Sequence, residues 1–324
     1  MNLEKKSKCV TGEFCQAAHS YFFVELNASK IHNERESQRI EKELEHTSPI
    51  IVFRGLKVYL FSGENFPAAL NAVGRLREEV FRMSGAGRGV EIDLDDLDFG
   101  EYAYKQLIAW DPGEKELVAV YRFQYGSRSK EAGDEYLRTS TLFEYSSEFR
   151  ENMLPYAIEL GRSVVNPSAK KSRFGFYALW KGLGVVFQLN PELKYFFGNV
   201  SLYKTMNTNA LKLLVSYLET HYPPPVPLLK AKPNLRFHAD AAVPEVVRTG
   251  ETDTPAQRIK QLTRLMNEHG EEVPQILKSY MSLSNEIWFG ETVIDRDFGD
   301  AWEIGLIVPF EHIDPKIKGT FSGG

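Results

Sequence analysis

Residues 158–175 read IELGRSVVNPSAKKSRFG, and this stretch decides the fold that we expect for the chain. Its first part is apolar and β-favouring apart from Glu159 and Arg162, which predicts a strand over residues 158–165. A basic turn containing Pro167 follows, and the next residues have the pattern of an amphipathic helix. A strand holds a carboxylate rigidly, and the start of a helix offers unpaired N–H groups and a positive dipole end to a phosphate. The stretch therefore predicts a catalytic base beside an anion-binding turn.

Glu159 and Arg162 are three positions apart, so a regular strand would point their side chains to opposite faces of its sheet. A β-bulge, which Gly161 favours, would bring both side chains toward one cleft. The alternative is an ion pair with a neighbouring strand at the sheet surface, and for the pair taken alone it is the better interpretation.

The flanking pattern predicts further strands and helices on both sides of this segment. Before it we expect a hairpin of residues 50–53 and 57–61, a helix over residues 66–83, and antiparallel strands over residues 104–110 and 117–125. After it we expect helices over residues 174–189, 208–222, 256–269 and 273–283, and strands over residues 195–203, 287–294 and 303–308. This order favours an α/β (α+β) fold with one mixed sheet flanked by helices.

The chain divides into four expected parts. Residues 1–48 are a charged, mostly helical appendage, and residues 49–222 form the core. Residues 223–255 begin with YPPPVPLL and are predicted to be a Pro-rich surface excursion or insertion. Residues 256–324 regain periodicity and are expected to rejoin the core.

Composition excludes several classes of protein. The chain has 324 residues and a formal net charge of −5 at pH 7, which argues against a nucleic-acid binder. The two cysteines indicate neither a disulfide scaffold nor a zinc site, and the histidines lack metal-ligand spacing. No apolar run suggests a signal peptide or a membrane span, so a cytoplasmic protein is expected, with contact to the inner face of the membrane as an open alternative.

Other residues become candidates through their position. Arg77 and Phe81 share one face of the helix over residues 66–83, Asp95 and Asp98 lie in an acidic turn, and Arg122 is a charge in the middle of a strand. The simpler interpretation of Arg77 and Phe81 is a core aromatic beside a solvent-reaching arginine. The simpler interpretation of Asp95 and Asp98 is a solvated turn with a helix-capping role. Arg122 needs a partner inside the sheet.

Taken in order, these residues resemble the acyl-homoserine-lactone synthases. The resemblance is closer to their relatives, the ornithine-lipid and glycine-lipid N-acyltransferases, some of which carry the label hemolysin. In those relatives a strand E-L-G-R-S runs into V-x-P and a helix with L-W-[RK]-G-[LI], as it does here from Glu159 to Leu183. The tail is similar too, at residues 274–280 and 295–298. The resemblance covers roughly residues 69–320.

The resemblance implies a GNAT-like fold, with a mixed, largely antiparallel central sheet flanked by helices, and acyl transfer from a phosphopantetheine thioester to an amine. Glu159 would be the base, directly or through a water, Arg162 would be a further catalytic residue, and Tyr203 would protonate the leaving thiolate, although a strand tyrosine is more often core. The backbone near residues 161–164 would polarise the thioester carbonyl. The acceptor side would be formed by Arg77, Phe81, Asp95, Asp98 and Arg122. The donor side would be formed by Ser163, Val164, Val165, Lys170, Lys171, Arg173 and Gly175. The resemblance implies no metal and no permanently bound cofactor.

The donor is expected to be acyl carrier protein. Acetyl-CoA-using members of the fold place several glycines in the phosphate loop, whereas only Gly175 remains in SRFGFYA. A single phosphodiester needs less wrapping than a pyrophosphate, and the basic residues suit an acidic carrier helix. We therefore expect a fatty, 3-hydroxyacyl chain to be joined to an ornithine- or glycine-type amino acid in aminolipid synthesis. An acetyl-CoA-dependent N-acetyltransferase and a non-catalytic GNAT-like binding protein remain the alternatives.

Overall fold

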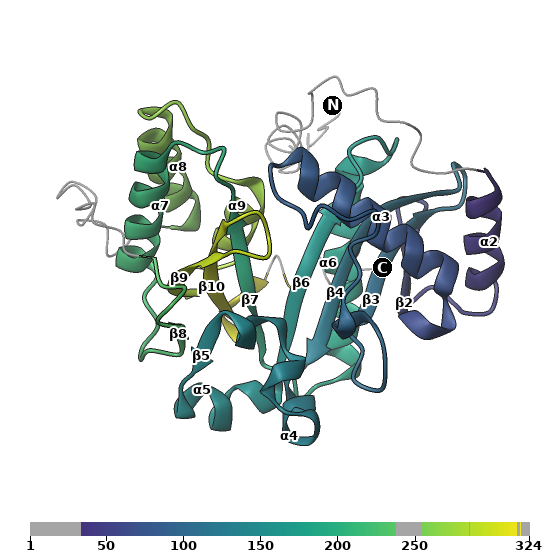
Figure 1. Cartoon of the computed structure of the whole chain (residues 1–324), viewed down its shortest axis with the longest axis horizontal. Helices are drawn as coiled ribbons and strands as arrows, with labels where there is room; N and C mark the ends of the chain where they lie inside the picture. Colours follow the sequence, from purple (N-terminus) through teal and green to yellow (C-terminus); the bar gives the residue numbers. More distant parts are fainter. Residues whose placement is uncertain (1–33, 238–253, 285, 316–317, 319–324) are drawn as a thin grey trace, which may run out of the picture.

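The computed structural model describes residues 34–237, 254–284, 286–315 and 318 (Figure 1). Within them, eight strands form one sheet in the order β1-β2-β3-β4-β6-β7-β10-β9. Their bounds are β1 Ile51–Phe53, β2 Leu56–Ser62, β3 Lys105–Asp111, β4 Glu116–Tyr125, β6 Ala157–Val165, β7 Tyr195–Leu202, β9 Trp288–Asp295 and β10 Ala301–Pro309. All neighbours pair antiparallel except β6 and β7, which are parallel. The expected mixed, largely antiparallel sheet is confirmed.

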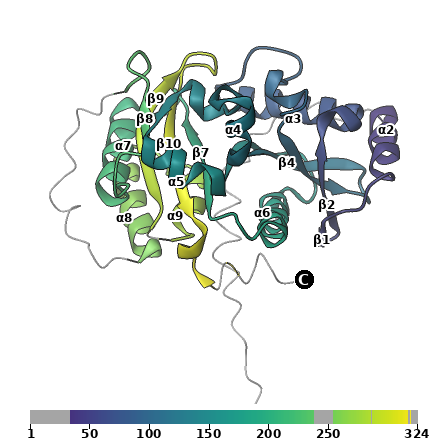
Figure 2. The same ribbon diagram turned by 90° about the horizontal axis from the view of Figure 1, so that it is seen from below.

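Helices cover both faces of the sheet. Figure 2 shows α3 (Pro67–Met83) and α6 (Ser172–Leu189) on opposite faces of its N-terminal half. The face covered by α3, here called the α3 face, carries a buried cluster that includes Tyr59, Ile108, Val120 and Val164. The opposite face, here called the α6 face, carries a larger cluster to which α7 (Thr208–His221), α8 (Pro255–Asn267) and α9 (Gln275–Met281) contribute. No helix in the described part of the chain is long and apolar enough to cross a membrane.

Two glycines let α6 lie close to the sheet. A Cβ on Gly175 would stand 2.9 Å from the Cβ of Ala119, and one on Gly182 would stand 2.9 Å from Val58 Cγ1. A helix with larger residues at these positions would have to move away from the strands. Gly175 is therefore explained by packing in the first turn of α6.

The N-terminal appendage is more integrated than the sequence indicated. Helix α2 (Glu34–Leu44) buries Ile40 and Leu44 in the cluster beneath α3. The carboxylate of Glu43 accepts hydrogen bonds from the N–H groups of Ala68 (2.8 Å) and Ala69 (2.9 Å), which caps the start of α3. Residues 34–44 thus pack on the core rather than standing apart from it as an appendage, and residues 1–33 lie outside the described residues.

A small second sheet lies over the C-terminal half of the α3 face. β5 (Phe143–Tyr145) pairs with β8 (Leu229–Ala231), and α5 (Ser147–Asn152) packs into the same buried cluster. Leu228 and Leu229 are buried there, so these residues do not belong to a surface excursion as the Pro-rich sequence suggested. Residues 238–253 of that predicted excursion lie outside the described residues.

The parallel ladder between β6 and β7 is short. Its pairs run from Ala157↔Tyr195 to Leu160↔Gly198, and beyond them both strands continue without pairing to each other. We call this point of divergence the splay. A Cβ on Gly198 would lie 2.5 Å from the carbonyl oxygen of Leu160, so only glycine permits the last pair.

Candidate active site

A β-bulge lies in β6 next to the splay. Arg122 of β4 pairs with Gly161 and Val120 pairs with Val164, so β6 has one more residue than β4 between these two pairs. The bulge that Gly161 was expected to favour is therefore present. The residue in the left-handed conformation is Arg162, with φ of 54°, which is uncommon outside glycine. A Cβ on Gly161 would have no atom within 4 Å.

The bulge brings Glu159 and Arg162 to one face. Glu159 lies between Ile158 and Leu160, which both pack in the cluster on the α6 face, so its own side chain points to the α3 face. Arg162 reaches the same side, because its Nε lies 3.3 Å from Asp93 Oδ2 and its guanidinium lies 4.8 Å from the ring centre of Phe298.

Arg162 lies in an aromatic and acidic cage. Its guanidinium is 5.5 Å from the ring centre of Phe81, and its Nη2 lies 3.8 Å from Asp95 Oδ2. Burial, reinforced by the charge of Arg122 and opposed by Asp93 and Asp95, lowers the pKa of Arg162 to about 10. Phe81, which the resemblance placed on the acceptor side, is thus in contact with Arg162.

The other expected acceptor-side residues form a buried network. Arg77 Nη1 lies 3.1 Å from Asp98 Oδ1, and Arg122 Nη1 lies 2.9 Å from Asp98 Oδ2 and 2.7 Å from Asp95 Oδ1. Arg77 also donates to Gln106 at 2.6 Å. Burial alone would raise the pKa of Asp98, but Arg77 and Arg122 outweigh it and hold that pKa well below its usual range. These charges compensate one another and fasten the acidic turn to the sheet.

Glu159 is held by three donors from the chain. Its Oε1 accepts the N–H of Thr139 at 2.6 Å, and its Oε2 accepts the N–H of Arg138 at 3.0 Å and the hydroxyl of Tyr104. Glu159 is 1% exposed. The Tyr104 ring lies 4.8 Å from the Arg122 guanidinium, which links the carboxylate to the buried network. Glu159 therefore anchors the short helix η5 (Arg138–Thr141) to β6.

Tyr203 lies just beyond the end of β7 and is half-buried against the cluster under α3. Burial, with the charge of Glu303 adding and that of Arg162 opposing, raises the pKa of its hydroxyl well above the usual value. Its phenol therefore stays protonated at neutral pH.

The donor-side residues are not equivalent. Val164 is buried, whereas Ser163 and Val165 are half-buried. Lys171 Nζ lies 3.1 Å from the buried Asp111, so this lysine is tied to β3. Exposed basic residues remain beside it. They are Lys170, paired with Glu114 at 2.7 Å, and Arg173, whose guanidinium lies 4.6 Å from the ring centre of Phe174.

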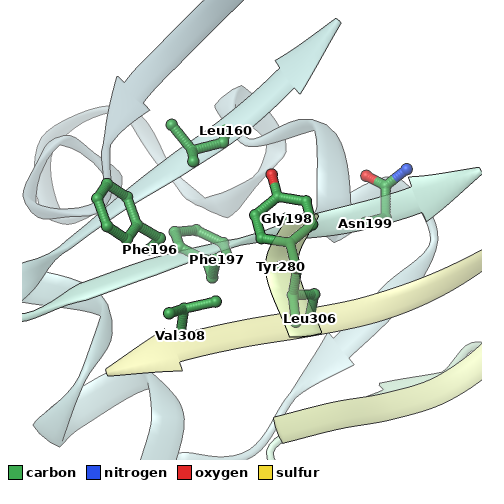
Figure 3. A pocket seen from close by; sticks show the side chains of 8 residues that line it. All are labelled: Leu160, Phe196, Phe197, Gly198, Asn199, Tyr280, Leu306 and Val308. Atoms are coloured by element: carbon green, nitrogen blue, oxygen red, sulfur yellow. The ribbon is translucent and has the colours of Figure 1, made fainter. Parts of the chain in front are cut away.

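A small pocket opens at the splay. Figure 3 shows it between the last residues of the β6–β7 ladder, β10 and Tyr280 of α9. Its lining is mostly apolar and consists of Leu160, Phe196, Phe197, Gly198, Asn199, Tyr280, Leu306 and Val308.

Several neighbours of these residues escaped the sequence interpretation. Asp93 was in the acidic turn already singled out, and Glu303 is a charge within the apolar strand AWEIGLIV, the same signal that marked Arg122. Tyr104, Arg138 and Thr139 carried no such signal.

Comparison with known proteins shows which family the chain is similar to. The acetyltransferase (GNAT) domain family matches residues 76–181. A glycine N(alpha)-acyltransferase of Bacteroides thetaiotaomicron is 33% identical over 273 residues, covering 81% of this chain and 80% of its own length. A protein of the same name from Phocaeicola vulgatus is 30% identical over 272 residues, covering 81% and 83%.

Among solved structures, the CoA-dependent acyl-homoserine lactone synthase BjaI with SAM and isopentyl-CoA matches with a TM-score of 0.32 and 15% identity, over 45% of this chain and 67% of its own. The AHL synthase LasI matches with a TM-score of 0.31 and 15% identity, over 50% of this chain and 78% of its own.

Proposed function

The chain belongs to the GNAT-fold N-acyltransferases that include the bacterial glycine N(alpha)-acyltransferases, and it is an acyltransferase; from that premise, we propose that it joins a fatty acyl group, carried as a thioester on acyl carrier protein, to the amino group of a small amino acid. The observation that carries the proposal is the bulge of β6 beside the splay. It brings a carboxylate, Glu159, and a guanidinium, Arg162, to one face where the sheet opens.

The thioester would lie at the splay. Beyond Leu160 the edge of β6 has no β7 partner within the described residues, so the backbone of residues 161–164 can donate to the thioester oxygen as it gains charge. The apolar pocket around Phe196 and Tyr280 would receive the start of the acyl chain.

The acceptor would approach from the α3 face. Its nitrogen must lose protons on the way from ammonium to amide, and Glu159 would serve as a base for this, directly or through a water. Arg162 would lie beside the acceptor, between Phe81 and Phe298. Arg77, Asp95, Asp98 and Arg122 would shape this side by fixing the acidic turn. Tyr203 would give its proton to the leaving thiolate.

The carrier-protein donor is supported by the start of α6. Gly175 serves helix packing, so the loop offers few glycine N–H groups for a pyrophosphate, while Lys170 and Arg173 present exposed positive charge. A 3-hydroxyacyl chain, an ornithine- or glycine-type acceptor and a role in aminolipid synthesis complete the proposal. The shared name of the two relatives favours glycine as the first acceptor to test.

The test measures release of free thiol by the purified protein. Acyl carrier protein and CoA thioesters of several chain lengths are each combined with a panel of amino acids, and the acylated product is identified by mass. We expect release with a long-chain carrier thioester and a small amino acid. Release with acetyl-CoA alone would indicate the N-acetyltransferase alternative, and no release with any pair would contradict acyl transfer.

A further inference from the structure

A second buried carboxylate lies at the splay. Glu303 of β10 pairs in register with Ser201 of β7, beyond Gly198, where β7 has already separated from β6. Its neighbour Ile304 packs in the cluster on the α6 face, so the Glu303 side chain points to the α3 face, as that of Glu159 does. Figure 3 shows Asn199, one of its partners, next to Gly198 on the same strand. Glu303 thus lies across the splay from the bulge.

Among the described residues, Glu303 has only neutral hydrogen-bond partners. Ser201 Oγ lies 2.8 and 2.9 Å from its two oxygens, and Asn199 donates to Oε2. It is 1% exposed, and in the described part of the chain no Lys, Arg or His lies within ion-pair distance of it. A buried carboxylate without a cation is costly to the fold, so its presence next to an open strand edge indicates a chemical role.

The charged groups that face Glu303 are few. From β9, Asp295 opposes its ionisation, and from η5, Arg138 favours it, although that guanidinium is already paired with Asp295. Tyr203 follows the end of β7, and its pKa is raised by the charge of Glu303 and lowered by that of Arg162 from β6. Burial is the dominant influence and raises the pKa of Glu303 to about 7. A base of that strength is matched to neutral conditions.

We propose that Glu303 is a second proton-accepting residue of the acyl transfer, which takes the first proton from the ammonium group of the acceptor. The inference rests on the proposed function. Glu159 is less suited to this first step, because three donors of the chain already occupy its oxygens, two of them backbone N–H groups. Glu303 has two neutral side-chain donors and retains lone pairs for an incoming ammonium.

The proton balance closes with the residues described. An ammonium N–H bond breaks, the electron pair stays on nitrogen, and the proton passes to Glu303. The nitrogen forms a bond to the thioester carbon, the C–S bond breaks, and the thiolate takes a proton from Tyr203. The second amine proton goes to Glu159 and from there restores Tyr203. One proton, from Glu303, leaves to solvent for each amide formed.

The experiment compares two amines in wild type and Glu303→Gln. One is the amino acid that the thiol-release panel identifies, which is an ammonium at neutral pH, and the other is hydroxylamine, which is largely unprotonated there. With the amino acid, Glu303→Gln should lower kcat/KM by roughly 10²-fold or more at pH 7, with a loss that shrinks as the pH rises. With hydroxylamine it should stay within about threefold of wild type, because the first proton is already gone.

Two further variants separate a chemical role from a structural one. Ser201→Ala removes one donor to the carboxylate. The rise of kcat/KM with pH that wild type shows near pH 7 should therefore occur at a higher pH in this variant. Glu291→Gln changes a half-buried carboxylate of the edge strand β9 that pairs with Arg236, and should leave the profile unchanged. If Glu303→Gln fails to fold, the pH profile of kcat/KM in Ser201→Ala alone tests the inference.

The inference is overturned if kcat/KM of Glu303→Gln with the amino acid equals that of wild type, or if kcat/KM falls equally with the amino acid and with hydroxylamine. It is also overturned if the apparent pKa of the kcat/KM profile is the same in Ser201→Ala as in wild type. Failure of the proposed function looks different, since the wild type itself would then release no thiol with any donor and acceptor.

Discussion

The carboxylate of Glu159 accepts the backbone N–H of Thr139 at a distance of 2.6 Å, so the residue proposed as the base also holds the neighbouring helix η5 in place. An amide at this position presents one donor where the chain needs two acceptors.

Glu159→Gln should therefore lose both activity and stability. We expect kcat to fall by roughly 10²-fold or more, as for loss of a general base. We also expect the free energy of unfolding to fall by about 1–3 kcal/mol, because a buried N–H loses its acceptor. Denaturant unfolding and thiol release measure the two effects. Tyr104→Phe, which removes a donor and leaves the carboxylate, is the matched control and should cost less stability. Full activity of Glu159→Gln would rule Glu159 out as the base.

Gly198→Ala should disturb the splay, whereas Gly161→Ala should not. The new methyl group at Gly198 would stand 2.5 Å from the Leu160 carbonyl oxygen, and backbone cannot yield as a side chain does. We expect a loss of roughly 1–3 kcal/mol for Gly198→Ala. Gly161 has open space around its Cα and no positive φ. The free energy of unfolding of its alanine variant should therefore lie within about 0.5 kcal/mol of the wild-type value. Equal denaturation midpoints for the two variants would contradict this account of the ladder.

Glu303→Gln should stabilise the fold at high pH. The folded-state pKa of Glu303, about 7, lies above its ordinary value of 4.5, so the folded protein binds more protons between these pH values. Wild-type stability should therefore fall as pH rises from about 4.5 to about 7, by roughly 3 kcal/mol at most. The glutamine variant avoids this loss. Denaturant unfolding at pH 5 and pH 8 should show a gain for the variant only at pH 8, and an equal effect at both would show that the carboxyl does not titrate in this range.

Asp98→Asn should be among the most damaging single changes. It would leave Arg77 and Arg122 buried without their shared carboxylate, which typically costs about 3–5 kcal/mol. Because the pKa of Asp98 is held low in the fold, the wild-type contribution is present above the ordinary carboxyl range and is lost as pH falls below it. The free energies of unfolding of wild type and Asp98→Asn, measured from pH 7 down to strongly acidic pH, should become equal at the acidic end. A variant as stable as wild type at pH 7 would contradict the network.

Lys170 and Lys171 should respond differently to alanine. Lys171 compensates the buried Asp111, so Lys171→Ala should cost stability, by about 3 kcal/mol or more. Lys170 is exposed, so the free energy of unfolding of Lys170→Ala should lie within about 0.5 kcal/mol of the wild-type value. If the start of α6 receives the carrier, Lys170→Ala should raise KM for the carrier thioester with kcat unchanged, and more so at low salt. An unchanged KM would place the carrier elsewhere.

The fold was predictable because its strands and helices are encoded locally. The helix opened by Pro67 and the hairpin strands β3 and β4 follow from apolar spacing and turn residues alone. The bulge was only one of two interpretations of the odd spacing between Glu159 and Arg162, and the sequence did not indicate which residue would adopt the positive φ. Gly161 was the natural choice, and Arg162 adopts it because its side chain then gains Asp93 and Phe298.

The candidate site was less predictable where partners come from distant parts of the chain. Tyr104 and Glu159 are 55 positions apart, and Arg138 and Asp295 are 157 apart, so no local pattern connects them. Lys171 illustrates the same limit. Its position in a basic turn suggested a free charge for a phosphate, and only the sheet shows that Asp111 lies beneath it.

The short parallel ladder between β6 and β7 also has a consequence for the order of folding. On one side of it, β3 and β4 pair across a tight turn. On the other side, β10 must find β7 over a long separation, with Glu303 and Asn199 standing 104 positions apart. Closing so long a loop has a higher entropic cost than closing a hairpin, so the C-terminal strands are expected to add late. Glu159 and Glu303 would share one sheet only after that last step, which leaves the partly folded chain without a complete acyl-transfer centre.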